Sequence, residues 1–171
     1  MRRRALCVTT IALVCLVLLQ PTSAMAAPCW RSPVSGTVVD PFRAPTCPYC
    51  AGNRGIEYGV APSTAVRAVA AGTVTYSGTI IGVIYVVVRH ANGWKITYGE
   101  LMSTSLRRGD RVAARSLIGR ATTRMYFGLR IGLEYRDPSP YLGRAVGRPR
   151  LVPVDGSRQR SAPPPVWRCS N

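Results

Sequence analysis

The chain has 171 residues, and its 23 Lys and Arg against 7 Asp and Glu give a formal net charge of +16. This length suits one domain with a real core and is too short for two domains of ordinary size. With a single histidine in the whole sequence, the chain lacks the residues for a metal site built on several histidines.

Residues 1–26 have the features of an export signal. A positive segment at residues 2–4 precedes an apolar stretch at residues 5–19, and small residues at 24–26 provide a cleavage site. We expect cleavage after Ala26 and a secreted, extracytoplasmic mature protein. An uncleaved N-terminal anchor is the alternative. No later segment is long and uncharged enough to cross a bilayer, so we expect no transmembrane span after cleavage.

The positive charge of this exported chain comes almost entirely from arginine, because Lys95 is its single lysine. Arginine presents a planar fork of donors that matches carboxylates and phosphates. Outside the cytoplasm the available polyanions are wall polymers, peptidoglycan carboxylates and anionic lipid headgroups. We therefore expect partners of this kind and no nucleic acid. Charge alone names no partner, and general solubility is the alternative explanation.

Four cysteines follow the signal, namely Cys29, Cys47, Cys50 and Cys169. An even number in an oxidising compartment predicts two disulfides. Three pairings are possible, and we favour Cys47 with Cys50 and Cys29 with Cys169, because the second pair ties together the two ends of the mature chain. The segment CPYC can also be read as a redox pair or as half a zinc knuckle. Its Pro and Gly neighbours do not suit the helix start that a redox site needs.

From Val34 onward the sequence alternates short β-branched runs with Gly, Asn, Asp and Pro, a pattern typical of strands and turns. The clearest hairpin is IYVVVRH-ANG-WKITYG, in which Asn92 and Gly93 supply the positive φ angles of a short loop. His90 ends the first strand of this hairpin, where we expect it to make a hydrogen bond rather than to act in catalysis. We predict an all-β fold, an antiparallel sandwich or a barrel-like arrangement, over residues 27–155.

Residues 156–171 differ in composition from the strand region. They contain three consecutive prolines among polar and arginine residues, which predicts an extended, polyproline-like C-terminal tail. If Cys169 is paired, the end of this tail is held against the domain.

Six segments of the strand region stand in a characteristic order: PVSGTVVDPF, RGIEYGV, AVRAVAAGTVTYSG, YVVVRHANGWKITYGEL, GDRVAARSLIGRA and FGLRIGLEYRDPSPYL. Together they resemble the LytM or lysostaphin-type zinc endopeptidases, which cut peptidoglycan cross-bridges. The resemblance covers residues 33–142, most of the mature chain. It implies a β-rich fold called a duplicated hybrid motif, in agreement with the strand pattern.

The metal site of the resembled family follows the motifs HxGxD, HxHF and YxHL. Laid on this sequence, the three metal ligands fall on Asn53, Glu57 and Tyr126. The two histidines that assist the attacking water fall on Glu100 and Arg124. None of these five positions holds a histidine here.

Hydrolysis of this kind needs a metal held by three protein ligands with an open fourth position. Of the three ligand positions only Glu57 carries an ordinary zinc ligand, and the guanidinium of Arg124 repels a divalent ion. We therefore expect no zinc, no other cofactor and no catalytic residue. Our hypothesis is that Arg124 takes the place of the metal beside Glu57 and Glu100. Drift of an abandoned site is the alternative.

The resulting functional hypothesis is a non-catalytic, LytM-like pseudo-peptidase module at the cell wall, which binds peptidoglycan or regulates a cell-wall hydrolase. Tyr58, Tyr98 and Tyr126 are candidates for stacking on sugars, and Arg124 is a candidate for pairing with peptide carboxylates. The same tyrosines can instead be core residues. Two other hypotheses remain open: an active endopeptidase with an atypical metal set, and a cationic protein that binds the wall surface.

Overall fold

The structure is a computed structural model that describes residues 28–47, 49–147, 153–158 and 161–169. The expected export signal lies outside these residues. The described part is almost entirely β-structure, with one short 3-10 helix, η1 (Ser139–Tyr141). Its strands are β1 (Trp30–Arg31), β2 (Thr37–Asp40), β3 (Ile56–Gly59), β4 (Ala65–Arg67), β5 (Gly72–Ile80), β6 (Val83–His90), β7 (Lys95–Ser103), β8 (Arg111–Val112), β9 (Leu117–Ile131), β10 (Glu134–Arg136), β11 (Leu142–Val146) and β12 (Val166–Arg168).

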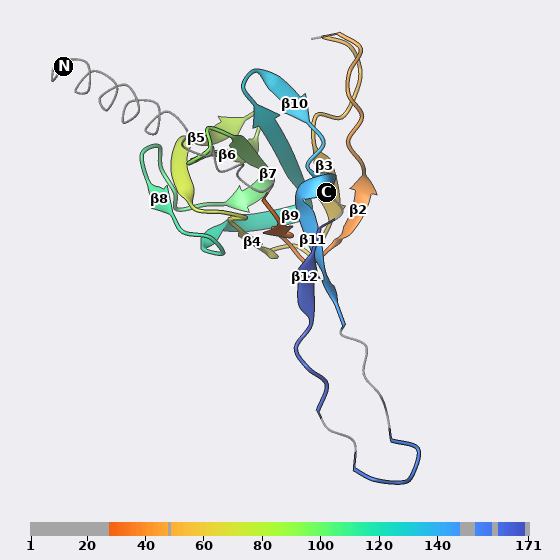
Figure 1. Ribbon diagram of the computed structural model, residues 1–171. Helices are drawn as coiled ribbons and strands as arrows, with labels where there is room; N and C mark the ends of the chain where they lie inside the picture. Colours follow the sequence, from red (N-terminus) through yellow and green to blue (C-terminus); the bar gives the residue numbers. More distant parts are fainter. Residues whose placement is uncertain (1–27, 48, 148–152, 159–160, 170–171) are drawn as a thin grey trace, which may run out of the picture.

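Nine of the strands form one antiparallel sheet in the order β2-β3-β9-β7-β6-β5-β8, with β4 and β10 also paired to β9 (Figure 1). The order is open, with β2 and β8 at its ends, so the sheet is not a closed barrel. The all-β prediction is confirmed. The expected hairpin joins β6 to β7. Gly93 has the predicted positive φ, at 81°, whereas Asn92 does not.

Side chains alternate between the two faces of this sheet, because successive residues of a strand point to opposite sides. Val88, Ile96 and Leu129 lie side by side on β6, β7 and β9, and all three are fully buried. Burying each such side chain contributes about 1.5–3 kcal/mol. The buried hydrophobic residues are Trp30, Val34, Ile56, Tyr58, Val66, Ala68, Val69, Val74, Val86, Val88, Ile96, Tyr98, Leu101, Val112, Ile118, Ala121, Met125, Phe127 and Leu129.

An aromatic cluster around Trp30 fastens the start of the described chain to the sheet. The Trp30 ring lies edge-on to Trp94 and Phe127, with ring centroids 5.9 and 6.5 Å away, and its centroid is 5.6 Å from that of Tyr141. His90 lies 6.5 Å from the same ring and is itself buried. Strand β1 is therefore held by ring packing as well as by its backbone.

The side chain of His90 makes a hydrogen bond, as expected, but to a residue before β5 rather than within the hairpin. Its Nδ1 donates to the carbonyl oxygen of Ala71 at 2.7 Å, which leaves Nε2 as the unprotonated nitrogen of the neutral ring. Its backbone N–H bonds to the carbonyl of Trp94 across the hairpin. Burial lowers the pKa of His90 below its usual value, so the ring is neutral at physiological pH.

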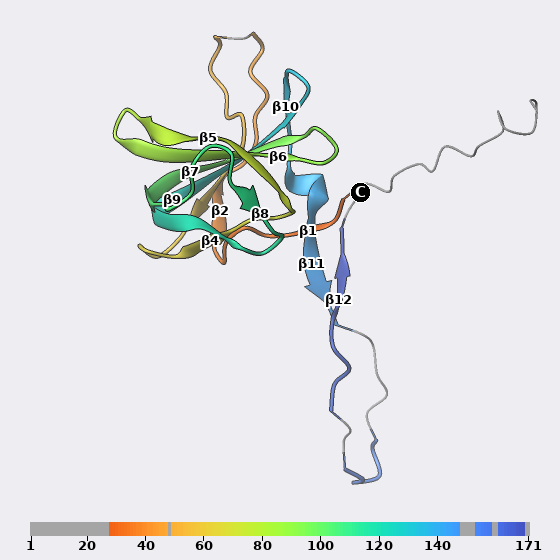
Figure 2. The ribbon, with the colours of Figure 1, turned by 90° about the vertical axis from the view of Figure 1, so that its left-hand side faces the viewer.

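A second, three-stranded sheet has the order β1-β11-β12. Strand β1 runs parallel to β11, and β12 runs antiparallel to it. Strands β11 and β12 project away from the large sheet in both views (Figures 1 and 2). The predicted tail 156–171 thus contains a strand, Val166–Arg168, that returns to the domain.

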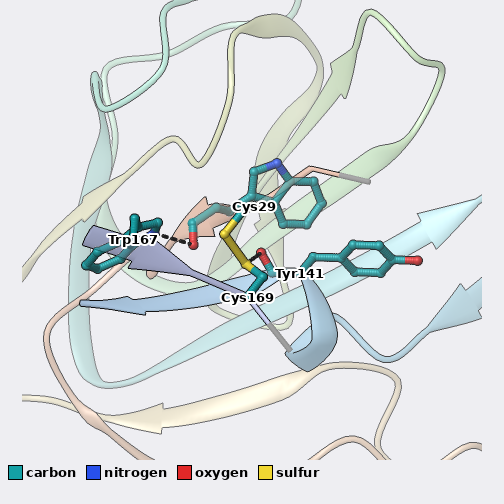
Figure 3. The surroundings of a disulfide bond; sticks show 5 residues. Cys29, Tyr141, Trp167 and Cys169 are labelled. Carbon is teal, nitrogen blue, oxygen red and sulfur yellow. Dashed lines mark hydrogen bonds between the residues drawn. A yellow bond between two sulfur atoms is a disulfide. The ribbon is translucent and has the colours of Figure 1, made fainter. Parts of the chain in front are cut away.

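The two disulfides are the pairs that the sequence favours, Cys29 with Cys169 and Cys47 with Cys50. Figure 3 shows the first of them, with Trp167 and Tyr141 beside it. The indole Nε1 of Trp167 donates to the backbone oxygen of Trp30 at 3.3 Å. In the chain-entropy account a disulfide that closes so long a loop contributes about 5 kcal/mol.

The 3-10 turn η1 is too short to cross a bilayer, and no other helix occurs in the part of the chain that the structure describes.

Candidate functional site

The five positions that the family resemblance singles out gather around one row of residues that crosses four strands. Asp40 of β2 lies opposite Glu57 of β3, and Glu57 lies opposite Tyr126 of β9. Tyr126 lies opposite Gly99 of β7. Residues directly opposite each other share a face of the sheet. This is the outward face, because the adjacent residues on β3, β7 and β9 are buried in the core.

Arg124 and Glu57 form an ion pair on this face. The Nη2 of Arg124 lies 3.2 Å from the Oε2 of Glu57. Arg124 is directly opposite Gly59, which has no side chain, so the guanidinium is free to lie diagonally across to Glu57. The two side chains are 53% and 25% exposed, and an ion pair this accessible contributes at most about 1 kcal/mol.

Asn53, at the first ligand position, is occupied by its own loop. The side chain is buried, at 6% exposure. Its amide nitrogen donates to the backbone oxygens of Asp40 and Pro41, at 3.3 and 3.1 Å, and its Oδ1 accepts the N–H of Gly55 at 3.2 Å. Asn53 therefore holds the loop after β2 against the start of β3, and its oxygen already accepts one backbone hydrogen bond.

Asp40 carries a second ion pair of the outward face, with Arg43 of the following loop. The hydrogen bond from Arg43 keeps the pKa of Asp40 below its usual value, and the charge of Arg124 acts in the same direction. Asp40 is therefore ionised at neutral pH. Two ion pairs thus lie at this edge of the row.

Glu100 lies on the outward face but does not share the ion pair. It occupies an irregular step of β7 between Gly99 and Leu101 and has a left-handed φ of 58°. No arginine or lysine of the described residues lies within salt-bridge distance of it. The expected grouping of Arg124 with both carboxylates is therefore present for Glu57 and absent for Glu100. A left-handed glutamate costs about 1–3 kcal/mol, and such residues cluster at functional sites.

Tyr126 lies over glycines on the outward face. A β-carbon at Gly55 or Gly128 would lie 2.7 Å from atoms of its ring or hydroxyl, so only glycine leaves room for the ring in this position. Burial of the ring raises the pKa of Tyr126 well above its usual value, and nearby Tyr135 and Tyr85 add to the shift. The phenol is therefore protonated at neutral pH.

Tyr85 of β6 completes the row and was not predicted from the sequence. Its ring covers Gly99 and meets Tyr126 edge to face, with ring centroids 6.5 Å apart. Burial raises the pKa of Tyr85, and the charges of Glu100 and Glu57 raise it further. Two neutral phenols therefore lie next to the carboxylates.

Tyr58 and Tyr98 do not line this face, which corrects the expectation that they stack on a ligand. Both point into the core, with 4% and 0% exposure. The hydroxyl of Tyr98 accepts the backbone N–H of Val69 at 3.0 Å. Each tyrosine follows a buried isoleucine by two residues, Ile56 and Ile96 respectively, so strand alternation places it inward. The alternative that these are core residues is correct.

A cavity of about 670 Å³ adjoins the row. It lies between the disulfide-closed loop before Asn53 and the turn that leads into β10. Tyr135 forms one wall, and the guanidinium of Arg54 lies 5.8 Å from the centre of its ring. The remaining lining residues are Phe42, Ala44, Pro45, Cys47, Leu133, Glu134, Arg136 and Asp137. No periodic sequence pattern indicates this cavity, because one wall is a loop and the other is the turn at Leu133 with the short strand β10.

The site thus offers paired charges, two phenols and a partly apolar cavity. These groups can bind sugars by stacking and can bind carboxylates or amides through charged hydrogen bonds. Among the described residues, no group of three or more His, Cys, Asp or Glu side chains is placed to hold a metal ion.

Comparison with known proteins agrees with the fold. The catalytic domain of lysostaphin from Staphylococcus simulans superimposes with a TM-score of 0.55 at 16% identity, over 62% of this chain and 91% of that one. A chain of the SpoIIQ–SpoIIIAH pore-forming complex gives 0.59 at 19% identity, over 68% and 92%. Csd3 of Helicobacter pylori gives 0.61 at 21% identity, over 70% of this chain. The matched region spans only 36% of the Csd3 chain.

A comparison with curated protein sequences gives no match. The sequence model described as peptidase family M23 matches residues 51–138, which is more than half of the chain; the match includes Asn53 and ends just before η1. The strands that carry Glu57, Glu100, Arg124 and Tyr126 all lie within this match. The chain therefore belongs to peptidase family M23.

Proposed function

We propose that this chain is a non-catalytic member of its family that acts outside the cytoplasm at the cell wall, where it binds peptidoglycan along the outward row. The ion pair between Arg124 and Glu57 is the observation that carries the proposal. It joins a position that assists water in the resembled family to a position that binds the metal there. A cation of the protein therefore lies beside the carboxylate that would otherwise bind zinc.

The side chains present do not fit a zinc ion. A catalytic zinc needs three protein ligands, but Asn53 is held by backbone groups and Tyr126 is a protonated phenol. At about 5 Å a guanidinium and a divalent ion repel each other by roughly 7 kcal/mol at an effective dielectric of 20. Arg124 thus opposes a metal at Glu57.

The same face suits a glycopeptide ligand. The rings of Tyr85 and Tyr126 lie edge to face over glycines and provide an aromatic surface on which a sugar can pack. Arg124 is exposed, and a stem-peptide carboxylate can share its fork of donors with Glu57. The adjoining cavity has room for a side chain of the ligand.

The test combines metal titration with binding to intact wall material. The full secreted chain is titrated with zinc in a calorimeter and then incubated with purified peptidoglycan sacculi. We expect no stoichiometric zinc binding, no release of soluble wall fragments, and loss of sedimentation with the sacculi in the Tyr126→Ala and Arg124→Gln variants. Arg108→Gln, in an exposed turn away from the row, is the charge-matched control.

Two outcomes contradict the proposal. Tight zinc binding with wall digestion that stops on addition of a chelator indicates an active endopeptidase with an atypical metal set. Retention of wall binding by both row variants, together with loss in moderate salt, indicates a cationic surface binder instead.

A protein partner is the second candidate. The similar fold in the SpoIIQ–SpoIIIAH complex belongs to a protein assembly, so an M23-type sheet can serve in protein association. In this chain such a partner would be a cell-wall hydrolase whose activity the module regulates. A change in the digestion rate of a purified wall amidase on addition of the wild-type chain, but not of the Arg124→Gln chain, supports this role.

A further inference from the structure

A second row of side chains crosses the same sheet and is strongly cationic. Arg111 of β8 lies opposite Thr73 of β5, and Thr73 lies opposite Arg89 of β6. Arg89 lies opposite Lys95 of β7, and Lys95 lies opposite Arg130 of β9. These five residues, called the cationic row below, form one continuous line across five neighbouring strands.

The cationic row is on the outward face of the sheet. The next residues of the same strands, Val74, Val88, Ile96 and Leu129, are all buried in the core, so alternation turns the row to the other side. Arg111 and Arg89 are exposed, and the other three members are half-buried. Neighbouring strands are about 4.8 Å apart, so the row is roughly 19 Å long.

No acidic side chain neutralises this row. Like charges directly opposite each other on a sheet are destabilising, and Arg89, Lys95 and Arg130 are such neighbours. The seven acidic residues of the chain are all described, and all are engaged elsewhere: Asp40, Glu57 and Glu134 with arginines outside the row, Asp110, Asp137 and Asp155 with backbone N–H groups, and Glu100 beside Tyr85.

Both ends of the row have features that suit a bound chain. At the β8 end a cavity of about 490 Å³ is lined by Thr73, Arg89 and Arg111. At the β9 end the guanidinium of Arg130 lies 6.0 Å from the centre of the Tyr135 ring, which lies directly opposite it on β10. The line therefore starts in a hollow and ends against an aromatic side chain.

We propose that the cationic row binds a linear phosphodiester polymer laid across the strands. Arginine forks match phosphate oxygens, and lysine binds phosphate as a point charge. A line one side chain wide, with half-buried members, suits a single extended chain better than a flat membrane surface. Arg130 lies on the same strand and the same face as Tyr126, about 13 Å further along the strand. The cationic row shares no residue with the outward row around Glu57 and Tyr126, and this proposal does not depend on the function of that row.

The experiment measures binding of fluorescent poly(glycerol phosphate) to the full secreted chain at several salt concentrations. The test variant is Arg89→Gln with Arg130→Gln. The control is Arg107→Gln with Arg108→Gln, which removes the same charge from an exposed turn. We expect the test variant to lose about ten- to a hundredfold in affinity and the control less than threefold. The slope of log affinity against log salt should fall by about 1.5–2 in the test variant only.

Thermal denaturation of both variants is the folding control. A melting temperature equal to that of the wild type shows that a loss of binding does not result from unfolding. Equal losses in the two variants would overturn the proposal, because binding would then follow net charge alone. Equal affinity for polyglutamate would overturn the preference for phosphate. Stronger, row-dependent binding to phosphatidylglycerol vesicles than to the soluble polymer would assign the row to a membrane surface instead.

Discussion

The two faces of the large sheet use the same residue type for opposite purposes. Tyr98 and Tyr126 lie on the neighbouring strands β7 and β9, one residue out of step with each other. Tyr98 is fully buried with its hydroxyl hydrogen-bonded, whereas Tyr126 lies over glycines among the charges of the outward row. Because the buried side chains lie on the inward face, we expect most of the stability to come from that face and the outward side chains to tolerate substitution better. The five positions that the family resemblance singles out all lie outward or in the loop that leads to that face.

The largest expected effect is on the inward face. Phe127 is fully buried and packs on Trp30 and Tyr98, so Phe127→Ala should lower the free energy of unfolding by about 3–5 kcal/mol. Urea denaturation of the oxidised protein measures this. The adjacent outward substitution Tyr126→Ala is the matched control, and a loss there as large as that of Phe127→Ala would contradict the division between the faces.

A pair of hydroxyl deletions sharpens the comparison. Tyr98→Phe removes the acceptor of the buried Val69 N–H and should cost about 1–3 kcal/mol. Tyr126→Phe should change the unfolding free energy by less than about 0.5 kcal/mol, because the hydroxyl of Tyr126 has no hydrogen-bond partner within the described residues. Both values come from the same urea titrations. A larger cost at Tyr126 than at Tyr98 would mean that the outward hydroxyl also stabilises the fold.

The inward face also makes stability depend on pH. Burial lowers the pKa of His90, and its Nε2 is buried without a hydrogen-bond partner among the described residues. As the pH falls through 6.5, His90 becomes protonated in the unfolded chain but stays neutral in the folded chain. The free energy of unfolding should therefore fall, by up to about 1.4 kcal/mol per pH unit.

Denaturation at pH 7.5 and pH 5.5 measures this pH dependence. His90 is the only histidine of the chain, so His90→Gln should remove most of the difference between the two pH values. An unchanged difference in that variant would assign the pH dependence to another group.

Much of the sequence-based prediction depends on the alternation of side chains along a strand, and that prediction ends where the alternation gives no information. The all-β fold and the β6–β7 hairpin follow from local pattern, and the disulfide pairs were chosen among three possible pairings because Cys29 and Cys169 lie at the two ends of the mature chain. The inward direction of Tyr58 was readable from its two-residue spacing to Ile56. The outward direction of Tyr85 could not be read in this way. The run VIYVVVRH is apolar at almost every position, so it does not show which residues face the core. The left-handed Glu100 depends on an irregular strand step that only tertiary pairing produces.

Rows across strands are the part of the site that no single segment reveals. Arg89, Lys95 and Arg130 come from three strands and become neighbours only through the hydrogen-bond register. A shift of one residue in any strand would turn its member to the other face. The register is fixed by burial of the adjacent apolar residues, so the core determines which charges meet on the outward face.

The smallest expected effect on stability is at Arg124. Its ion pair with Glu57 is half exposed, and such pairs contribute from nothing to about 1 kcal/mol. Arg124→Gln should therefore shift the free energy of unfolding by less than about 0.5 kcal/mol while abolishing wall binding. The double variant Arg124→Gln with Glu57→Gln measures the coupling between the two side chains. If Arg124→Gln alone lowers the free energy of unfolding by about 2 kcal/mol or more and the double change restores it, the unpaired carboxylate of Glu57 is destabilising. The ion pair is then needed for the fold. A small loss in both variants leaves the pair available to a ligand, as an outward-facing site requires.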